Sequence, residues 1–221
     1  MDRIRDSSSD FLGDLTMSEC QSITLRAPAK INWTLDILGR RADGYHEVDT
    51  LMQAVSLFDV LKFSSMSRNV CGITCDDPAI PTDERNLIYR AWSAMRDAFP
   101  SRVKGLRVAL TKRIPLGAGL GGGSSDAAAT MMAINRLYQL LLGKKSLAEL
   151  AATLGSDIPF FIYGGIVRAR GRGEIITPVR MPIYAQSLVI IYTGFPILTS
   201  DAYKRIKAPA FNPSSMAFDL K

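Results

Sequence analysis

A glycine-rich stretch at residues 114–128 constrains the fold of this chain more than any other feature. It reads Ile-Pro-Leu-Gly-Ala-Gly-Leu-Gly-Gly-Gly-Ser-Ser-Asp-Ala-Ala. The glycines leave no Cβ atoms to hold the backbone away from a ligand, and they tolerate positive φ. Residues 126–138 have good helix propensity, and Ser124 and Ser125 supply hydroxyls suited to capping that helix. Because free N–H groups at a helix N-terminus bind phosphate, the stretch predicts a nucleotide-phosphate site.

Two common phosphate-loop patterns and a flexible linker are the alternatives for this stretch. The Walker A pattern needs a lysine directly after the glycines, and the next lysine is Lys144. The dinucleotide pattern is matched by Gly117, Gly119 and Gly122, but the acidic residue expected about 20 positions later is missing. A linker does not usually lie between an apolar strand (106–110) and a helix.

The remaining pattern, Pro-x-Gly-x-Gly-Leu-Gly-x-x-Ser-Ser, resembles the ATP loop of the GHMP kinases. Five further segments match this family in order and spacing. They are Ala-Pro-Ala-Lys-Ile-Asn at 27–32, Arg-Ala-Asp-Gly-Tyr-His-Glu-Val at 41–48, Asn86-Leu87, Leu-Gly-Ser-Asp-Ile-Pro-Phe at 154–160 and Gly-Arg-Gly-Glu at 171–174. Within the family, the pattern is most similar to kinases that use ATP and Mg²⁺ to phosphorylate the 2-hydroxyl of 4-diphosphocytidyl-2-C-methyl-D-erythritol, in non-mevalonate isoprenoid precursor synthesis.

The resemblance implies an α+β GHMP kinase fold. Residues 21–179 are expected to form the N-terminal ATP-binding lobe, of a type that also occurs in a ribosomal protein. Residues 180–221 are expected to begin an incomplete second α/β lobe, because family members continue past the position of Lys221. Exposed apolar residues there predict aggregation or a homodimer. Residues 1–20 are acidic and lack the apolar region of a signal peptide, which predicts a disordered extension.

The resemblance assigns activation of the acceptor hydroxyl to Lys30 and Asp157. A carboxylate can accept the hydroxyl proton, and a nearby ammonium keeps the carboxylate ionised and stabilises the developing negative charge. Without the resemblance, Asp157 is better explained as a helix N-cap ahead of Pro159. Lys30 is then better explained as a solvated lysine at the end of a strand.

The resemblance also implies the ligand-binding residues. The cytosine is expected to stack on Tyr45 and to hydrogen-bond with His46; stacking on an aromatic ring contributes about 1–3 kcal/mol per base in nucleic-acid complexes. Asn32 is expected to bind the diol or the diphosphate, and Thr199 takes the place of a family threonine beside the acceptor. The alternatives are a turn that merely contains Tyr45 and His46, and an ordinary polar strand residue at Asn32.

The ATP-binding residues implied by the resemblance are Pro115, Leu116, Gly117, Ala118, Gly119, Leu120, Gly121, Gly122, Gly123, Ser124 and Ser125. Either serine hydroxyl is a candidate to reach Mg²⁺, although helix capping explains the same serines. Two rival functions stay open. One is a GHMP kinase for another small alcohol, against which Gly44-Tyr45-His46 argues; the other is an inactive fragment or a nucleic-acid-binding module.

Composition narrows the class of protein. The net charge of +6 suits polyanionic small molecules such as ATP and a cytidine diphosphate alcohol. The sequence has no long block of lysines and arginines, so we expect no nucleic-acid partner. A single histidine excludes a His-rich metal site. Three cysteines with one Cys-x-x-x-Cys pair form neither a disulfide framework nor a complete zinc site, and indicate a reducing compartment. No apolar run is long enough to span a membrane, so we expect a cytoplasmic enzyme without a membrane partner.

The pattern of residues predicts mixed helices and strands. Residues 31–38 alternate, which predicts a half-buried strand with Ile31, Trp33, Leu35 and Ile37 on one face and Asn32 on the other. Asp43-Gly44 predicts a turn. Further strands are expected at 48–62, 106–112, from 163 onward, and as a buried strand at 186–192. Helices are expected at 86–99, 125–142 and 146–154, and from 159.

Overall fold

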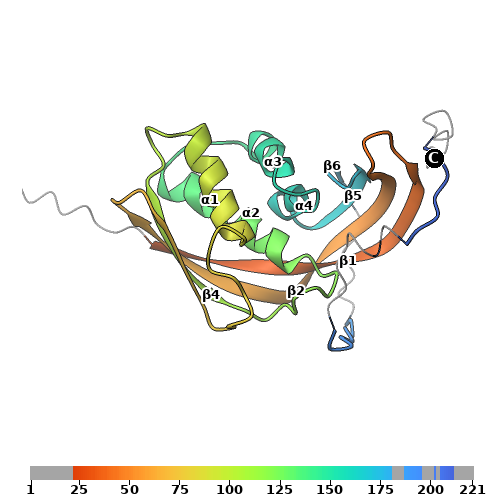
Figure 1. Cartoon of the computed structure of the whole chain (residues 1–221), viewed down its shortest axis with the longest axis horizontal. Helices are drawn as coiled ribbons and strands as arrows, with labels where there is room; N and C mark the ends of the chain where they lie inside the picture. The colour runs from red at the N-terminus through yellow and green to blue at the C-terminus, as the bar shows by residue number, and fades with distance from the viewer. Residues whose placement is uncertain (1–21, 181–186, 196–201, 203–204, 212–221) are drawn as a thin grey trace, which may run out of the picture.

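The computed structural model describes residues 22–180, 187–195, 202 and 205–211. Within these residues, a six-stranded sheet carries four helices on one face (Figure 1). The arrangement confirms the expected α+β class.

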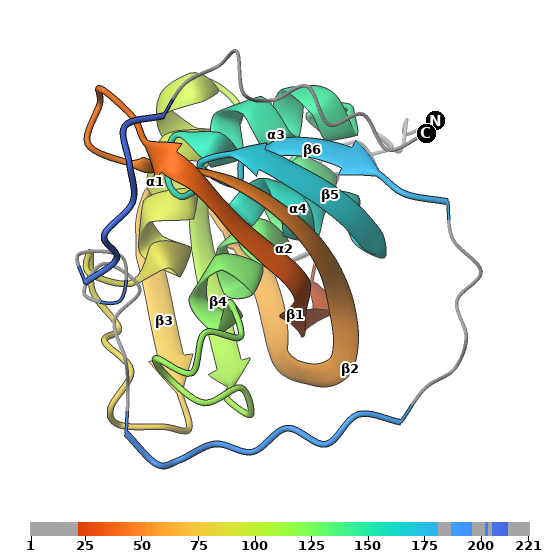
Figure 2. The same ribbon diagram turned by 90° about the vertical axis from the view of Figure 1, so that its right-hand side faces the viewer.

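A long antiparallel hairpin forms the centre of the sheet. It consists of β1 (Ser22–Arg40) and β2 (His46–Met66), which curve strongly together (Figure 2). The turn between them contains Gly44 at φ 86°, which confirms the turn predicted at Asp43-Gly44. Both strands extend beyond the predicted ranges.

The other edge of β2 pairs with two different strands. Its C-terminal part pairs with β4 (Gly105–Thr111), and its N-terminal part pairs with β5 (Ile166–Gly171). The sheet is completed by β6 (Ile175–Pro178) beside β5 and by β3 (Cys71–Cys75) parallel to β4. The sequence did not predict β3, because it is only five residues long and has Gly72 at its second position.

The helices are α1 (Leu87–Ala98), α2 (Gly122–Leu137), α3 (Lys144–Ala152) and α4 (Ile158–Tyr163). All four were predicted, with shifted ends. The α2 helix stops earlier than expected, and Gln139 and Leu141 just beyond it have positive φ angles of 49° and 59°.

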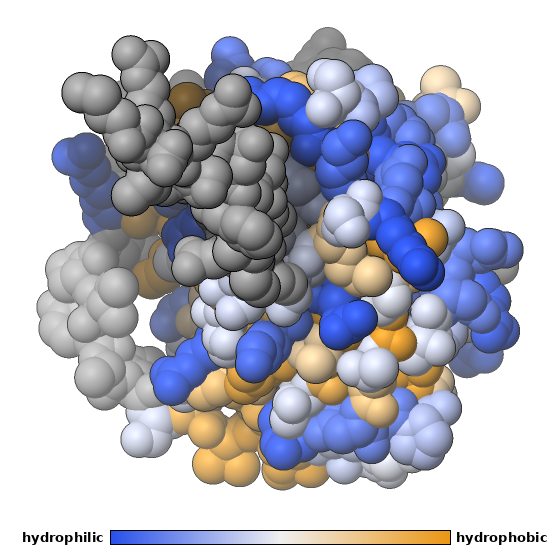
Figure 3. All heavy atoms as spheres, turned by 90° about the vertical axis from the view of Figure 1, so that its left-hand side faces the viewer, coloured by the Kyte–Doolittle hydropathy of each residue, from blue (hydrophilic) through white to orange (hydrophobic). Residues whose placement is uncertain are grey.

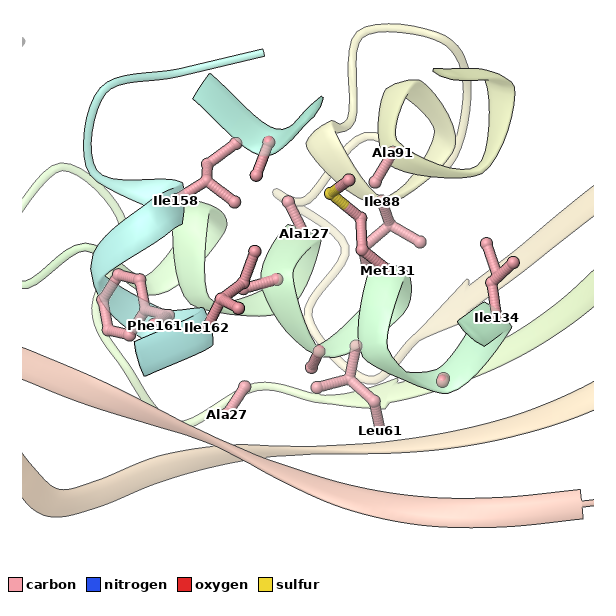
Figure 4. Close-up of a cluster of buried hydrophobic side chains, with 14 of the residues drawn as sticks. Ala27, Leu61, Ile88, Ala91, Ala127, Met131, Ile134, Ile158, Phe161 and Ile162 are labelled. Atoms are coloured by element: carbon pink, nitrogen blue, oxygen red, sulfur yellow. The ribbon is translucent and has the colours of Figure 1, made fainter. Parts of the chain in front are cut away.

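The core lies between the sheet and the helices, with α2 at its centre (Figure 4). Alanines at 127, 128, 129 and 133 are all fully or almost fully buried, so α2 packs closely against its neighbours. Leu61 contributes from the sheet, Ile88 from α1 and Phe160 from α4, each fully buried. Each large apolar side chain buried in this way contributes about 1.5–3 kcal/mol. This packing fixes where α2 begins, and therefore where the glycine loop lies.

The predicted alternation at residues 31–38 is wrong. The pairing of β1 with β2 shifts between Asn32 and Thr34, which leaves Trp33 as an extra residue in β1. A bulge of this kind reverses which residues face each side of the strand. Trp33 and Leu35 are 45% and 47% exposed, so they do not lie on a buried face of the strand.

The buried strand predicted at 186–192 is also wrong for the described residues. Residues 187–195 form no strand, and Val189 and Ile191 are 88% and 85% exposed. The expectations for residues 1–20 lie outside the described residues.

No helix in the described part of the chain is long and apolar enough to cross a membrane. Figure 3 shows one end of the molecule, where hydrophilic residues cover much of the visible described surface and hydrophobic ones gather along one edge.

Candidate active site

The glycine loop joins β4 to α2 and ends in a helix N-terminus. Gly117, Gly119 and Gly121 have φ angles of 67°, 73° and 71°, which glycine adopts without steric cost. Gly121 is the N-cap of α2, so the prediction that Ser124 and Ser125 cap this helix is wrong. The N–H of Ser125 donates to the carbonyl of Gly121 at 2.9 Å. The N–H groups of the three preceding residues have no acceptor within the helix, as expected for an anion site.

Contacts around Gly121 require a glycine there. A Cβ atom at Gly121 would lie 2.8 Å from Cζ of Phe161 and 3.1 Å from Cγ of Lys30. The N–H of Lys30 also donates to the carbonyl of Leu120 at 2.9 Å. The loop is therefore held directly against β1, beside the lysine to which the family resemblance assigns a catalytic role.

A cavity of about 790 Å³ brings most of the predicted site residues together. Its lining includes Lys30 and Asn32 from β1, the loop residues from Pro115 to Ser124, and Asp157 at the start of α4. Ser125 does not line the cavity; it is buried, and its hydroxyl has no partner within the described residues. Of the two serines, Ser124 is therefore the one that faces the cavity.

Lys30 and Asp157 form an ion pair in this cavity. The Lys30 Nζ lies 3.7 Å from Oδ2 of Asp157, and the two side chains are 10% and 39% exposed. The carboxylate of Asp157 makes no capping hydrogen bond to α4. Helix capping therefore does not explain this residue, and a solvated strand end does not explain Lys30.

A chain of hydrogen bonds orients the Lys30 ammonium. Lys30 Nζ donates to Oδ1 of Asn32 at 2.7 Å, and Nδ2 of Asn32 donates to Oγ1 of Thr50 at 2.7 Å. Thr50 in turn donates to the carbonyl of Thr34 at 2.6 Å. Asn32 is thus an orienting neighbour of Lys30 as well as a lining residue of the cavity.

Tyr45 and His46 lie at the turn between β1 and β2 and are not part of the cavity lining. Tyr45 is 52% exposed. The guanidinium of Arg172, which does line the cavity, lies 4.9 Å from the centre of the Tyr45 ring. Thr199 lies outside the described residues.

Three buried charged residues behind the loop were not predicted from the sequence. The Lys112 Nζ donates to Oδ2 of Asp59 and, at 3.0 Å, to Oδ2 of Asp126. Asp59 Oδ1 also accepts from the N–H groups of Arg113 and Ile114, at 2.6 and 2.8 Å. The cluster therefore joins β2, the end of β4 and the first turn of α2, on both sides of the glycine loop. No sequence motif links these residues, because Asp59 and Asp126 lie 53 and 14 positions from Lys112.

The charge of this cluster depends on Asp126. The pKa of Asp126 is raised to about 7, mainly by burial; the Lys112 ammonium opposes the rise and the nearby Asp59 carboxylate adds to it. The carboxylates of Asp126 and Asp59 raise the pKa of Lys112 against the effect of burial, so the ammonium stays charged. Oδ1 of Asp126 has no hydrogen-bond partner within the described residues. The missing partner at Oδ1 favours protonation of Asp126, because a buried carboxylate oxygen without a hydrogen bond is costly.

Comparison with known proteins agrees with this geometry. Residues 86–165 match the family profile described as the GHMP kinases N terminal domain. The chain is 44% identical over 184 residues to the 4-diphosphocytidyl-2-C-methyl-D-erythritol kinase of Thermodesulfovibrio yellowstonii, covering 83% of this chain and 62% of that protein. It is 39% identical over 182 residues to the enzyme of the same name from Bacillus subtilis, covering 82% and 62%. The chain thus spans less than two thirds of the length of these relatives.

Two solved structures have a similar fold. One is a 4-(cytidine 5'-diphospho)-2C-methyl-D-erythritol kinase, with 43% identity, a TM-score of 0.61, and coverage of 72% of this chain and 56% of that one. The other is the homoserine kinase of Cytophaga hutchinsonii, with 23% identity, a TM-score of 0.56, and coverage of 82% and 63%; it supports the fold alone. Together with the glycine loop and the ion pair beside it, these similarities show that the chain has the GHMP kinase fold and contains the N-terminal domain of that family.

Proposed function

We propose that this chain forms the ATP-binding part of a kinase that phosphorylates the 2-hydroxyl of 4-diphosphocytidyl-2-C-methyl-D-erythritol. The observation that carries the proposal is the single cavity shared by the N-terminus of α2 and the Lys30–Asp157 pair. One part suits the phosphates of ATP, and the other suits a hydroxyl that must lose a proton. The names of the relatives support the choice of substrate.

The chemistry follows from the positions of these groups. The N–H groups at the start of α2 bind the phosphates of ATP, and Asp157 accepts the proton of the substrate hydroxyl. The hydroxyl oxygen forms a bond to the γ-phosphorus as the bond to the β–γ bridging oxygen breaks. Lys30 holds the Asp157 carboxylate ionised and stabilises the negative charge that develops on the oxygen.

A magnesium ion bound with ATP would neutralise phosphate charge. The described residues contain no group of three or more His, Cys, Asp or Glu that could hold a metal. This fits Mg²⁺, which is commonly held by substrate phosphates, water and only one or two protein ligands. We propose Ser124 as the hydroxyl that reaches it, because Ser124 lines the cavity and Ser125 is buried.

We further propose that residues 21–179 act as the ATP-binding lobe and that residues 180–221 begin a second lobe. Tyr192 lines the cavity, and its hydroxyl donates to the carbonyl of Leu116 at 3.4 Å. The segment containing it therefore reaches the glycine loop. Self-association through the exposed apolar residues of this segment stays a prediction.

A transfer assay with alternative alcohols tests the proposal. The chain is incubated with Mg²⁺, ATP labelled at the γ-phosphate, and one of three acceptors: 4-diphosphocytidyl-2-C-methyl-D-erythritol, homoserine or mevalonate. We expect label in the cytidine compound alone. Label in another alcohol would show a different substrate, and binding of ATP without transfer to any acceptor would show that this chain is not an active kinase.

A further inference from the structure

The Gly-Arg-Gly-Glu segment at 171–174 forms the turn between β5 and β6. Gly171 and Gly173 have φ angles of 75° and 110°, which suit glycine. The Glu174 carboxylate accepts from the N–H of Arg172 at 2.6 Å and from its Nε at 3.3 Å. Glu174 therefore fixes both the backbone and the side-chain direction of Arg172.

A buried glutamate fastens this turn to the β1–β2 hairpin. Glu47 is 6% exposed; its Oε1 accepts from the N–H of Gly171 at 3.1 Å, and its Oε2 accepts from Nη1 of Arg41 at 2.6 Å. The turn that carries Arg172 is thus held at a set distance from the turn that carries Tyr45.

Arg172 lies between the two ends of the proposed substrate site. Its guanidinium lies 4.9 Å from the centre of the Tyr45 ring. The next residue lies close to Asp157: a Cβ atom at Gly173 would be 3.8 Å from Oδ1 of Asp157. Both Arg172 and Gly173 line the cavity. Any molecule that places a base at Tyr45 and a hydroxyl at Asp157 must pass Arg172.

The guanidinium retains binding capacity. Its Nε faces Glu174, but neither terminal nitrogen has a hydrogen-bond partner within the described residues. By contrast, the Lys30 ammonium is already engaged by Asn32 and Asp157. A guanidinium with free terminal nitrogens matches the oxygens of a phosphate in a two-pronged contact.

We propose that Arg172 binds the diphosphate of the cytidine diphosphate alcohol, an inference that rests on the proposed function. In this substrate class the diphosphate joins the cytidine to the alcohol, so it lies where Arg172 lies. The residue acts on substrate affinity and placement, and Asp157 and Lys30 act on the hydroxyl.

The affinities of the full chain for cytidine and for cytidine 5'-diphosphate distinguish two roles of Arg172. In one, Arg172 contacts the diphosphate; in the other, it only holds the Tyr45 ring in place. Arg172→Gln is compared with wild type and with Arg107→Gln, which removes an exposed arginine of β4 that does not line the cavity. Dissociation constants are measured by calorimetry for both cytidine ligands, and for ATP as a check on folding. Because charge-assisted hydrogen bonds are among the stronger ones in proteins, Arg172→Gln should weaken the binding of cytidine 5'-diphosphate about 10- to 100-fold. Cytidine and ATP should change less than about three-fold, and Arg107→Gln should bind all three ligands as wild type does.

The outcomes distinguish the inference from the function on which it rests. An equal loss of cytidine and cytidine 5'-diphosphate in Arg172→Gln would overturn the inference, because Arg172 would then act only through Tyr45. Unchanged affinity for cytidine 5'-diphosphate would also overturn it. A wild-type chain that binds ATP but neither cytidine ligand would instead refute the proposed substrate.

Discussion

Replacing Asp126 with asparagine should change the pH dependence of stability in a defined direction. Asp126 is 3% exposed and faces Lys112, and asparagine keeps its shape and an oxygen for the Lys112 hydrogen bond while removing the titration. Burial, together with the Asp59 carboxylate, raises the pKa of Asp126 from 3.8 to about 7 in the folded chain. The folded state therefore holds this proton more tightly than the unfolded state does. Stability is lost as the pH rises between about 4 and 7, because the unfolded state releases the proton first.

The size of the effect follows from the difference between the two pKa values. Each unit corresponds to about 1.4 kcal/mol. At pH 5, most of the corresponding loss of stability has not yet occurred, and at pH 8 the loss is complete. Ionisation of Asp126 should therefore lower the free energy of unfolding of the wild-type chain by about 2–3 kcal/mol over that interval. Asp126→Asn should not incur this loss.

Urea unfolding at pH 5 and pH 8, followed by tryptophan fluorescence, measures this difference. The free energy of unfolding of Asp126→Asn relative to wild type should increase by about 2–3 kcal/mol from pH 5 to pH 8. Asp97→Asn, which removes a carboxylate that is 65% exposed on α1, serves as the control and should show no such change. A wild-type to Asp126→Asn difference that is the same at both pH values would refute the account of the buried cluster.

Two further predictions concern the glycine loop and a cysteine. Gly121→Ala and Gly119→Ala place alanine at nearly the same positive φ, but only Gly121 has atoms within 4 Å of the new methyl group. Both variants should be destabilised by about 1–2 kcal/mol because of backbone strain. Gly121→Ala should also bind ATP more weakly than Gly119→Ala does in titration calorimetry. Equal ATP affinities of the two variants would show that the Phe161 contact is unimportant. Burial raises the pKa of the Cys71 thiol to about 12, so mass spectrometry at pH 8 should find Cys71 almost unalkylated by iodoacetamide in the folded chain and labelled after unfolding. Rapid labelling in the folded chain would contradict this burial.

Features with a local cause were predictable from the sequence. The glycine loop, the helix behind it and the hairpin turn each depend on glycine or on helix propensity within a few residues. The placement of Lys30 next to Asp157 was inferred only from the family resemblance, because these residues are far apart in the chain and meet through the packing of β1 beside the loop.

Features that depend on pairing between distant segments were not predictable. The bulge at Trp33 arises from the register of β1 against β2, and it reverses the faces that strict alternation predicts. The Asp59–Lys112–Asp126 cluster combines three segments, and each residue alone is an ordinary charged residue. The apolar run at 187–192 has the composition of a buried strand, but a strand also needs a neighbour to pair with, and within the described residues it has none.

The rate of phosphoryl transfer in a double-mutant cycle tests the central claim most directly. Lys30→Met, Asp157→Asn and the double variant are compared with wild type in single-turnover transfer from ATP to 4-diphosphocytidyl-2-C-methyl-D-erythritol. If the two residues act as one unit, each single variant should lose about 10²- to 10⁴-fold in rate while ATP affinity stays within a few-fold, and the double variant should be hardly slower than either single one. Near-normal transfer by Asp157→Asn, or losses that multiply in the double variant, would contradict the account.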